Sequence, residues 1–310
     1  MIKMYKTTSE NQLKEIKRIE KGCWINVISP SENEIKYLTR KFNIPPEFIM
    51  DALDIDERAR TEKEDNVSLI ILRIPSNGKV DIEKYVTVPL GIIIVPNVII
   101  TVSLYPNEII KDFTKNKVRN FSTSKKSRFV LQILYKTALL YLNYLKEINK
   151  RTSIVEKELH QSMRNEELIK LLNIEKCLVY FITSLKSNEL MMEKLYTAKI
   201  LKMYPDDKEL LEDVIIENKQ AIEMANIHSN ILSGMMDAFA SVISNNLNIV
   251  MKFLTSITII LMIPTLVASI YGMNINLPLQ HSPYAFAILM IISLGLSLIG
   301  VIIFLKRKIF

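Results

Sequence analysis

Residues 253–271 read FLTSITIILMIPTLVASIY, an apolar run of 19 residues, and residues 284–305 read YAFAILMIISLGLSLIGVIIFL, a second run of 22 residues. No Asp, Glu, Lys or Arg occurs in the 53 residues between Lys252 and Lys306. As helices, the two runs measure about 28 Å and about 33 Å, close to the roughly 30 Å hydrocarbon core of a bilayer. We therefore predict two membrane-spanning helices, in preference to two buried helices of a large soluble core.

The cations that flank these runs predict the orientation. Lys252 precedes the first run, and Lys306, Arg307 and Lys308 follow the second, whereas the loop at 272–283 contains none. Positively charged residues concentrate on the cytoplasmic side of a membrane. We therefore expect a multi-pass protein of the cell (plasma) membrane, with both termini in the cytoplasm and the short loop outside.

Composition argues against several other classes of protein. Cys23 and Cys177 are far apart in the chain, so neither a disulfide scaffold nor a structural zinc site is expected. The polar N-terminus has no apolar signal-peptide core. The net charge of +7 comes without a basic cluster interleaved with aromatic residues, so no nucleic-acid partner is expected. The sequence also shows no catalytic pair and no phosphate loop, and we expect neither an enzyme nor an organic cofactor.

Proline and glycine divide the remaining chain. Seven of the 11 prolines lie at or before Pro106, and no glycine occurs between Gly91 and Gly234. The front of the chain should therefore have short elements, and the rest should form long helices. Runs rich in Val, Ile and Thr predict strands at 23–28, 67–74, 85–95 and 98–104.

Two further features of the front part can be interpreted. Ser31 with Glu34 is a capping-box pattern that predicts a helix over 31–42. An acidic run is interpreted as a solvated face in preference to a metal site; it contains Asp51, Asp54, Asp56 and Glu57.

The back of the chain predicts three long helices. Two lie between Ser127 and about Lys202, with a break near Arg164-Asn165, and the third begins at Pro205. The 58 residues from 206 to 263 lack proline and would extend about 87 Å as a helix, directly into the first span. We therefore expect an α/β cytosolic domain at 1–125, a long-helix stalk at 126–246 and a two-helix membrane domain at 247–310.

One line along the third helix lacks Leu, Ile, Val and Phe. Steps of alternately four and three residues from Asp237 follow the seam of a supercoiled helix. We call the ten positions on this line the polar stripe: Asp237, Ser241, Ser244, Asn248, Met251, Thr255, Thr258, Met262, Thr265 and Ser269. The second apolar run has no such line, and its small residues are interpreted as packing positions: Ser293, Gly295, Ser297 and Gly300.

Two explanations of the polar stripe compete. Ser and Thr in membranes often bond to carbonyls of their own helix or join neighbouring helices. Alternatively, the stripe lines water, which better explains why Asn248 and Asp237 continue it into the stalk. Two spans cannot enclose a pore alone, so this interpretation requires a homo-oligomer. Oxygen dipoles suit a small hard cation such as Mg²⁺, which gives up its water reluctantly. Met251 and Met262, with Leu254 beside the stripe, are bulky enough for an apolar gate.

The end of the first span carries Tyr271-Gly272-Met273-Asn274. Upstream lie NIVMKFLT at 248–255 and the pair Pro264-Thr265. With two C-terminal spans and a basic C-terminus, these residues closely resemble the CorA family of magnesium transport proteins, and the resemblance covers the whole chain.

The resemblance implies a homopentameric, funnel-shaped channel for Mg²⁺, and for Co²⁺ and Ni²⁺ as well. Asn274 would form an outer polar ring that binds hydrated Mg²⁺, while Gly272 and Met273 hold the turn. The pore would be lined by positions that match the family, namely Thr265, Asn248 and Asp237, and constricted by Met251 and Leu254. Two departures are the outer loop at 275–283, which has no acidic residue, and Ser269, where relatives often have glycine.

The resemblance also implies gating by cytosolic Mg²⁺ that carboxylates bind between subunits. Asp213 falls at the matching place on the stalk, and Asp81 is our choice for its partner in the front domain. Bound Mg²⁺ would hold the closed pentamer, and its loss would leave like charges that repel. The alternative for Asp213 is a solvated helix face.

Two other functions remain open. One is a relative of the same family specialised for Zn²⁺, although Met273 within the triplet favours magnesium. The other is a membrane-anchored coiled-coil scaffold without transport, which would not need a polar stripe.

Overall fold

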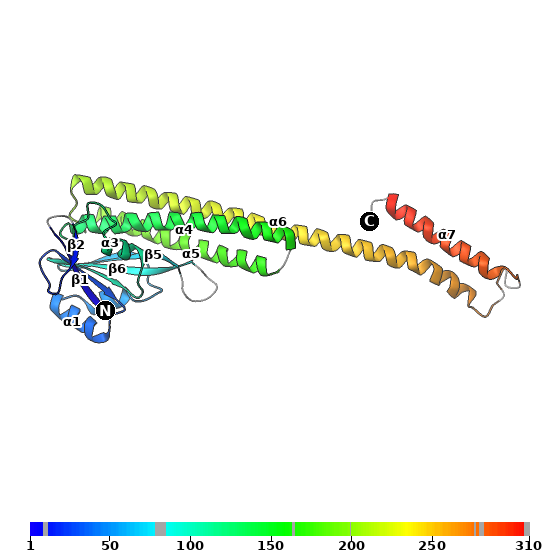
Figure 1. Cartoon of the computed structure of the whole chain (residues 1–310), viewed down its shortest axis with the longest axis horizontal. Helices are drawn as coiled ribbons and strands as arrows, with labels where there is room; N and C mark the ends of the chain where they lie inside the picture. The colour runs from blue at the N-terminus through cyan, green and yellow to red at the C-terminus, as the bar shows by residue number, and fades with distance from the viewer. Residues whose placement is uncertain are drawn as a thin grey trace. The chain divides into compact units, whose positions relative to one another are not determined.

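The computed structural model describes residues 1–8, 12–77, 85–162, 165–198, 200–275, 277–278 and 282–306, with the side chains of 160–162 left out. Figure 1 shows the chain and its elements. The chain forms two compact units, Met1–Gly234 and Met235–Phe310, and helix α6 contributes to both. The division into regions at 1–125, 126–246 and 247–310 stays a prediction.

The first unit is built on a mixed seven-stranded sheet with the order β2-β1-β3-β7-β6-β5-β4. Strands β3 and β7 are parallel, and the other neighbouring pairs are antiparallel. The strands are β1 Ile2–Thr7, β2 Leu13–Glu15, β3 Cys23–Ile28, β4 Arg60–Glu64, β5 Val67–Asn77, β6 Tyr85–Ile94 and β7 Val98–Ser103.

The four predicted strands are confirmed as β3, β5, β6 and β7, and β5 extends to Asn77. A tight turn joins β6 to β7, with Val95 N–H donating to Val98 O at 3.1 Å. Strands β1, β2 and β4 were not predicted from the sequence. Apart from the buried Tyr5 and Leu13, their residues are half-buried or exposed, and many are Lys or Glu, so these strands lack the continuous apolar signal of the inner strands.

Helices cover both faces of the sheet (Figure 1). Short helices α1 Glu32–Phe42 and α2 Pro46–Asp51 enclose one core with inward residues such as Ile25 and Ile93. On the other face, α3 Glu108–Thr114 and the long helix α4 Lys126–Ser162 enclose a second core around Trp24. Because successive strand residues point to opposite faces, each inner strand contributes to both cores, which explains their unbroken apolar runs.

The capping-box signal predicted from sequence is present at the atomic level. Ser31 caps α1, its side chain accepting from Glu34 N–H, and the Glu34 carboxylate accepts from Ser31 N–H at 2.8 Å. The expected capping box is therefore confirmed.

At the centre of the second core, the Trp24 indole N–H donates to Thr101 Oγ1 at 2.8 Å.

The long helices follow the predicted pattern. They are α4 Lys126–Ser162, α5 Asn165–Thr197, α6 Pro205–Tyr271 and α7 Ala285–Lys306. Helix α5 begins at Asn165, and the other residue of the predicted break, Arg164, lies outside the described residues. Helix α6 begins at Pro205 as expected and continues through Pro264 to Tyr271, eight residues beyond the proline-free stretch.

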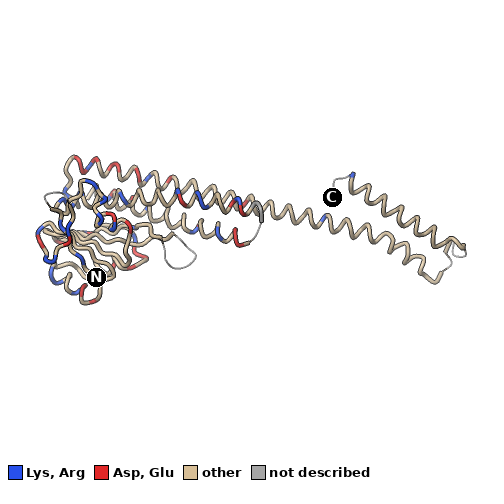
Figure 2. Tube along the Cα trace, in the orientation of Figure 1, with Lys and Arg blue, Asp and Glu red and all other residues tan. Residues whose placement is uncertain are grey.

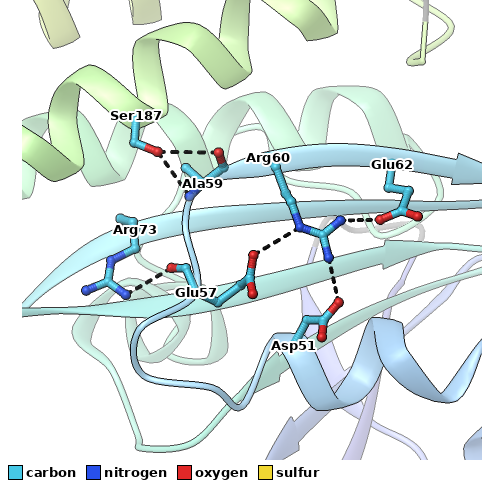
Figure 3. A network of polar contacts seen from close by, with 7 residues as sticks. All are labelled: Asp51, Glu57, Ala59, Arg60, Glu62, Arg73 and Ser187. Carbon is cyan, nitrogen blue, oxygen red and sulfur yellow. Dashed lines mark hydrogen bonds and ion pairs between the residues drawn. The ribbon is translucent and has the colours of Figure 1, made fainter.

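The acidic run of the front domain is only partly a solvated face. Asp54 and Asp56 are exposed, as expected, but Asp51 and Glu57 are half-buried and bind Arg60 at 2.5 Å and 3.0 Å (Figure 3). Burial raises the pKa of Asp51, while the charge of Arg60 opposes that rise. Half of the run therefore neutralises a partly buried guanidinium, which sequence spacing did not predict.

Candidate functional site

Two helices among the described residues, α6 and α7, are long and apolar enough to cross a membrane, judged by length and composition. Helix α6 ends at Tyr271, the last residue of the first apolar run, and α7 begins one residue into the second. Figure 2 shows that charged residues concentrate in the first unit, whereas α7 and the C-terminal part of α6 are almost free of them. The two predicted spans therefore coincide with helical segments.

One side of α6 faces α7 within the second unit. Ser297 Oγ donates to Ile260 O at 3.4 Å, and the side chains of Ile260 and Ile263 lie closest to Gly300. The partly buried positions of α6 in this region recur with a helical period: Ile257, Ile260, Ile263, Pro264, Val267 and Tyr271. These positions define the α7-facing side of the span.

The small residues of α7 differ in what they contact. Ser297 and Gly300 contact α6, which confirms them as packing positions. Among the described residues of one chain, a Cβ built at Gly295 would meet nothing within 4 Å, so the packing role of Gly295 stays a prediction. Ser293 is buried and donates to the Met290 carbonyl of its own helix at 3.1 Å.

The polar stripe lies on the opposite side of α6. At 100° per residue, the positions from Thr255 to Ser269 lie about half a turn away from the α7-facing positions. All ten stripe residues are exposed, including Asp237, Ser244 and Asn248. Helix α7 therefore covers the largely apolar side of the first span, where Ser256 is also buried, and leaves the stripe open.

Four of the six hydroxyls of the stripe are hydrogen-bonded to their own helix. The side chains of Thr255, Thr258 and Thr265 donate to carbonyls four residues earlier at 2.8, 2.9 and 3.1 Å. Ser241 does the same at 3.0 Å. A hydroxyl has one hydrogen and two lone pairs, so each of these groups presents only acceptor oxygen to its surroundings. Hydroxyls that bond to carbonyls of their own helix, one of the two explanations of the stripe, are therefore present. These bonds leave the hydroxyl oxygens along the stripe as hydrogen-bond acceptors.

Large apolar side chains interrupt the stripe and are also uncovered. Met251 and Met262 lie on the stripe and Leu254 lies beside it, with 53%, 63% and 57% of their surfaces exposed. Together with the hydroxyls, they make one face of α6 on which polar and bulky apolar positions alternate. This face is therefore neither wholly apolar, as a lipid-facing side would be, nor wholly polar.

The Tyr-Gly-Met-Asn segment forms a turn at the end of α6. Gly272 N–H donates to Ala268 O at 2.9 Å, and Met273 N–H donates to Ile270 O at 3.3 Å. A Cβ at Gly272 would lie 3.3 Å from Ala268 O, which is tighter than an ordinary contact. Glycine therefore lets the chain fold tightly over the helix end, and Asn274 follows directly with an exposed side chain.

Three other polar residues of this loop, Asn276, Gln280 and His281, lie outside the described residues.

The two carboxylates expected to bind a regulatory ion are not brought together by the described residues. Asp213 is exposed on α6 in the first unit, and Asp81 lies outside the described residues. The nearby Asp207 is buried and accepts the Tyr204 N–H at 3.2 Å, so it caps the start of α6. Among the described residues, no group of three or more His, Cys, Asp or Glu side chains could hold a metal ion.

The bond between Ser297 and Ile260 was not predicted from the sequence. The available signal was Pro264, four residues after Ile260, because proline lacks the N–H that would otherwise bind the Ile260 carbonyl.

Comparisons with known proteins agree with this architecture. The cobalt/magnesium transport protein CorA of Methanocaldococcus jannaschii is 28% identical over 291 residues, which cover 91% of this chain and 89% of that protein. The complete structure of CorA from the same organism has a TM-score of 0.86 at 26% identity, covering 98% of this chain and 97% of that one.

A more distant likeness shows the fold alone. The cytoplasmic domain of ZntB from Vibrio parahaemolyticus is 12% identical with a TM-score of 0.62, covering 79% of this chain and 96% of that one.

A family model described as CorA-like Mg²⁺ transporter protein matches residues 20–307. This match spans both compact units and both candidate membrane spans, and the chain belongs to the family of CorA-like Mg²⁺ transporter proteins.

Proposed function

We propose that this protein is a channel for divalent cations, mainly Mg²⁺ and also Co²⁺ and Ni²⁺, formed by five copies of the chain. It spans the plasma membrane twice per subunit with both termini in the cytoplasm. The observation that supports this most is the open polar stripe on the side of α6 opposite α7. In a ring of subunits with α7 toward the lipid, the stripe of each α6 would face the axis.

The hydrogen bonds of the stripe suit a hydrated cation. Water bound to Mg²⁺ through its oxygen can only donate hydrogen bonds outward, and Mg²⁺ keeps its water tightly. Thr255, Thr258 and Thr265 present acceptor oxygens to such water, because their hydrogens are used within the helix. An anion would find no hydroxyl donor at these three positions.

Specific roles follow within this proposal. Asn274 forms the selectivity ring at the outer mouth, on the turn that Gly272 and Met273 provide. Met251 and Leu254 form the hydrophobic gate, which closes by excluding water. The pore wall consists of Asp237, Ser244, Asn248, Thr255, Thr258, Met262, Thr265 and Ser269.

The regulatory site is proposed between subunits. Asp213 of one copy and Asp81 of its neighbour would bind cytosolic Mg²⁺, and bound Mg²⁺ would hold the pore closed. The exposure of Asp213 supports this, since a carboxylate that bridges subunits must be accessible in the single chain. We propose no catalytic activity and no organic cofactor.

The alternatives make different demands on the same face. Zn²⁺ favours cysteine and histidine ligands, and none lies on the polar stripe. A scaffold that only anchors a coiled coil would gain nothing from acceptor oxygens along an uncovered membrane face.

Ion entry into liposomes tests the function directly. Purified protein is reconstituted, Mg²⁺ is added outside, and an internal dye reports entry under an inside-negative potential. We expect Mg²⁺ entry well above that of empty liposomes, and slower Zn²⁺ entry. Faster Zn²⁺ than Mg²⁺ entry would favour the zinc alternative. No flux from inserted, pentameric protein would contradict the channel and favour the scaffold.

Replacing Asp213 by alanine should weaken closure by cytosolic Mg²⁺. Loss of one carboxylate ligand per site is expected to raise the Mg²⁺ concentration that protects the stalk from protease about tenfold, equivalent to about 1.4 kcal/mol. Limited proteolysis across a Mg²⁺ series measures this midpoint. Glu223→Ala, an exposed carboxylate on the same helix, is the control and should leave the midpoint unchanged. An unshifted midpoint for Asp213→Ala would remove Asp213 from the regulatory site.

A further inference from the structure

Pro264 lies inside the first span and leaves a carbonyl without its usual donor. In an α-helix, the N–H of residue 264 would bind the carbonyl of Ile260, but proline has no N–H. Helix α6 nevertheless continues through Pro264 to Tyr271. Within a bilayer no water is present to satisfy this carbonyl, so another donor must do so or the helix must distort.

Hydroxyl groups supply donors at this level of the helix. Ser297 Oγ of α7 donates to Ile260 O at 3.4 Å, and Thr265 Oγ1 donates to the next carbonyl, Leu261 O, at 3.1 Å. The first bond is long and comes from the neighbouring helix, whereas the second is local. The carbonyl that Pro264 frees is therefore the one that α7 contacts.

The packing around this bond allows the close approach. Gly300 lies one turn further along α7, and a Cβ there would lie 3.6 Å from Ile263 Cδ1 and 3.9 Å from Ile260 Cγ1. Ser293, one turn before Ser297, is buried but bonds to its own helix at Met290 O. The cross-helix bond is thus a property of Ser297 and not of every serine in α7.

We propose that Ser297 is a positioning residue of the pore, whose hydroxyl replaces the N–H missing at Pro264. By holding the Ile260 carbonyl, it fixes the direction in which α6 continues beyond the proline. That outer segment carries Thr265, Ser269 and the Gly272–Asn274 turn. This inference rests on the proposed channel function, because the position of these groups matters only if ions pass them.

If the Ser297 hydroxyl replaces the N–H missing at Pro264, the effect of substituting Ser297 should depend on whether residue 264 is proline. Ser297→Val removes the hydroxyl and Ser297→Thr keeps it, and both enlarge the side chain. In the native background, Ser297→Val should lower the rate of Mg²⁺ entry into liposomes roughly 3- to 10-fold relative to Ser297→Thr, the range for one hydrogen bond. In the Pro264→Ala background the alanine N–H binds the Ile260 carbonyl, so this difference should fall below about 1.5-fold.

A second readout separates the bond from the function. The midpoint of thermal unfolding in lipid nanodiscs is measured for the same four variants, and the valine–threonine difference should again shrink when Pro264 is replaced. Ser293→Val and Ser293→Thr serve as controls and should show no dependence on residue 264.

Equal valine–threonine differences in both backgrounds, by flux and by unfolding, would show that Ser297 acts through packing alone and would overturn the inference. Coupling in unfolding with an inactive native protein would instead contradict the channel proposal while leaving the bond established. Coupling in unfolding but not in flux, with a conducting native protein, would also overturn the positioning role.

Discussion

Asn274→Ala should abolish measurable Mg²⁺ entry into liposomes, a loss of about a hundredfold or greater. The amide follows the tight turn at Gly272 and is exposed at the end of α6. In an oligomer the same substitution occurs in every subunit. If each amide contributes one hydrogen bond to the hydrated ion, at about 0.5–1.5 kcal/mol net, five copies together contribute about 2.5–7.5 kcal/mol, and a hundredfold change in rate corresponds to roughly 2.7 kcal/mol.

The control for this variant is Ile275→Ala, which changes an exposed neighbour on the same turn without removing a polar group. Flux should stay within about twofold of the native rate, since surface substitutions of this kind have small effects. Gel filtration of both variants shows whether assembly is intact. Native flux from correctly assembled Asn274→Ala protein would show that the amide does not select the ion.

Elements with a local signal were predictable from sequence. The Ser31–Glu34 pair predicted the start of α1, and Pro205 predicted the start of α6. The two uncharged runs predicted the helical segments that end at Tyr271 and begin at Ala285. In each case the residues that decide the structure lie within a few positions of one another. Long-range contacts did not need to be known.

Elements that depend on distant partners were not predictable. Strand β4 reads RTEKE and forms because it pairs with β5, while Arg60 within it joins Asp51 and Glu57 from earlier segments (Figure 3). No spacing rule indicates that a lone arginine will recruit those carboxylates. The interpretation of that acidic run as a wholly solvated face was incomplete for this reason.

The candidate site shows the same division. Periodicity alone located the polar stripe, because a helix places residues three and four apart on one face. The sequence did not indicate which face of α6 is covered by α7, because α7 is apolar on all sides. The structure resolves this through Ser297 and Gly300, which place α7 against Ile260 and Ile263. The partner of Asp213 stays a prediction, because Asp81 lies outside the described residues.

Met251→Ser should open a leak when cytosolic Mg²⁺ is high and the native channel is closed. Met251 lies on the stripe between Asn248 and Thr255, with about half of its surface exposed, and a ring of such side chains would exclude water from a narrow pore. Serine is smaller and polar, and its hydroxyl can bond to the helix as that of Thr255 does. Water would then persist at the constriction, and we expect Mg²⁺ entry under closing conditions to rise about tenfold or more, equivalent to about 1.4 kcal/mol in the barrier.

Val250→Ser is the control variant, which distinguishes the loss of a gate at Met251 from a general weakening of helix α6. Val250 is exposed to a similar degree, but it lies about 100° around the helix from Met251 and off the stripe. It introduces the same serine one residue away in the same turn. Because Met favours a helix more than Val does, Met251→Ser should weaken the helix more than Val250→Ser, but only by a few tenths of a kcal/mol. The channel model predicts a leak from Met251→Ser alone, measured as dye-reported Mg²⁺ entry into liposomes preloaded with millimolar Mg²⁺ on the cytoplasmic side. Equal leaks from both variants would mean that α6 has loosened as a whole, and no leak from either would place the closed constriction away from Met251.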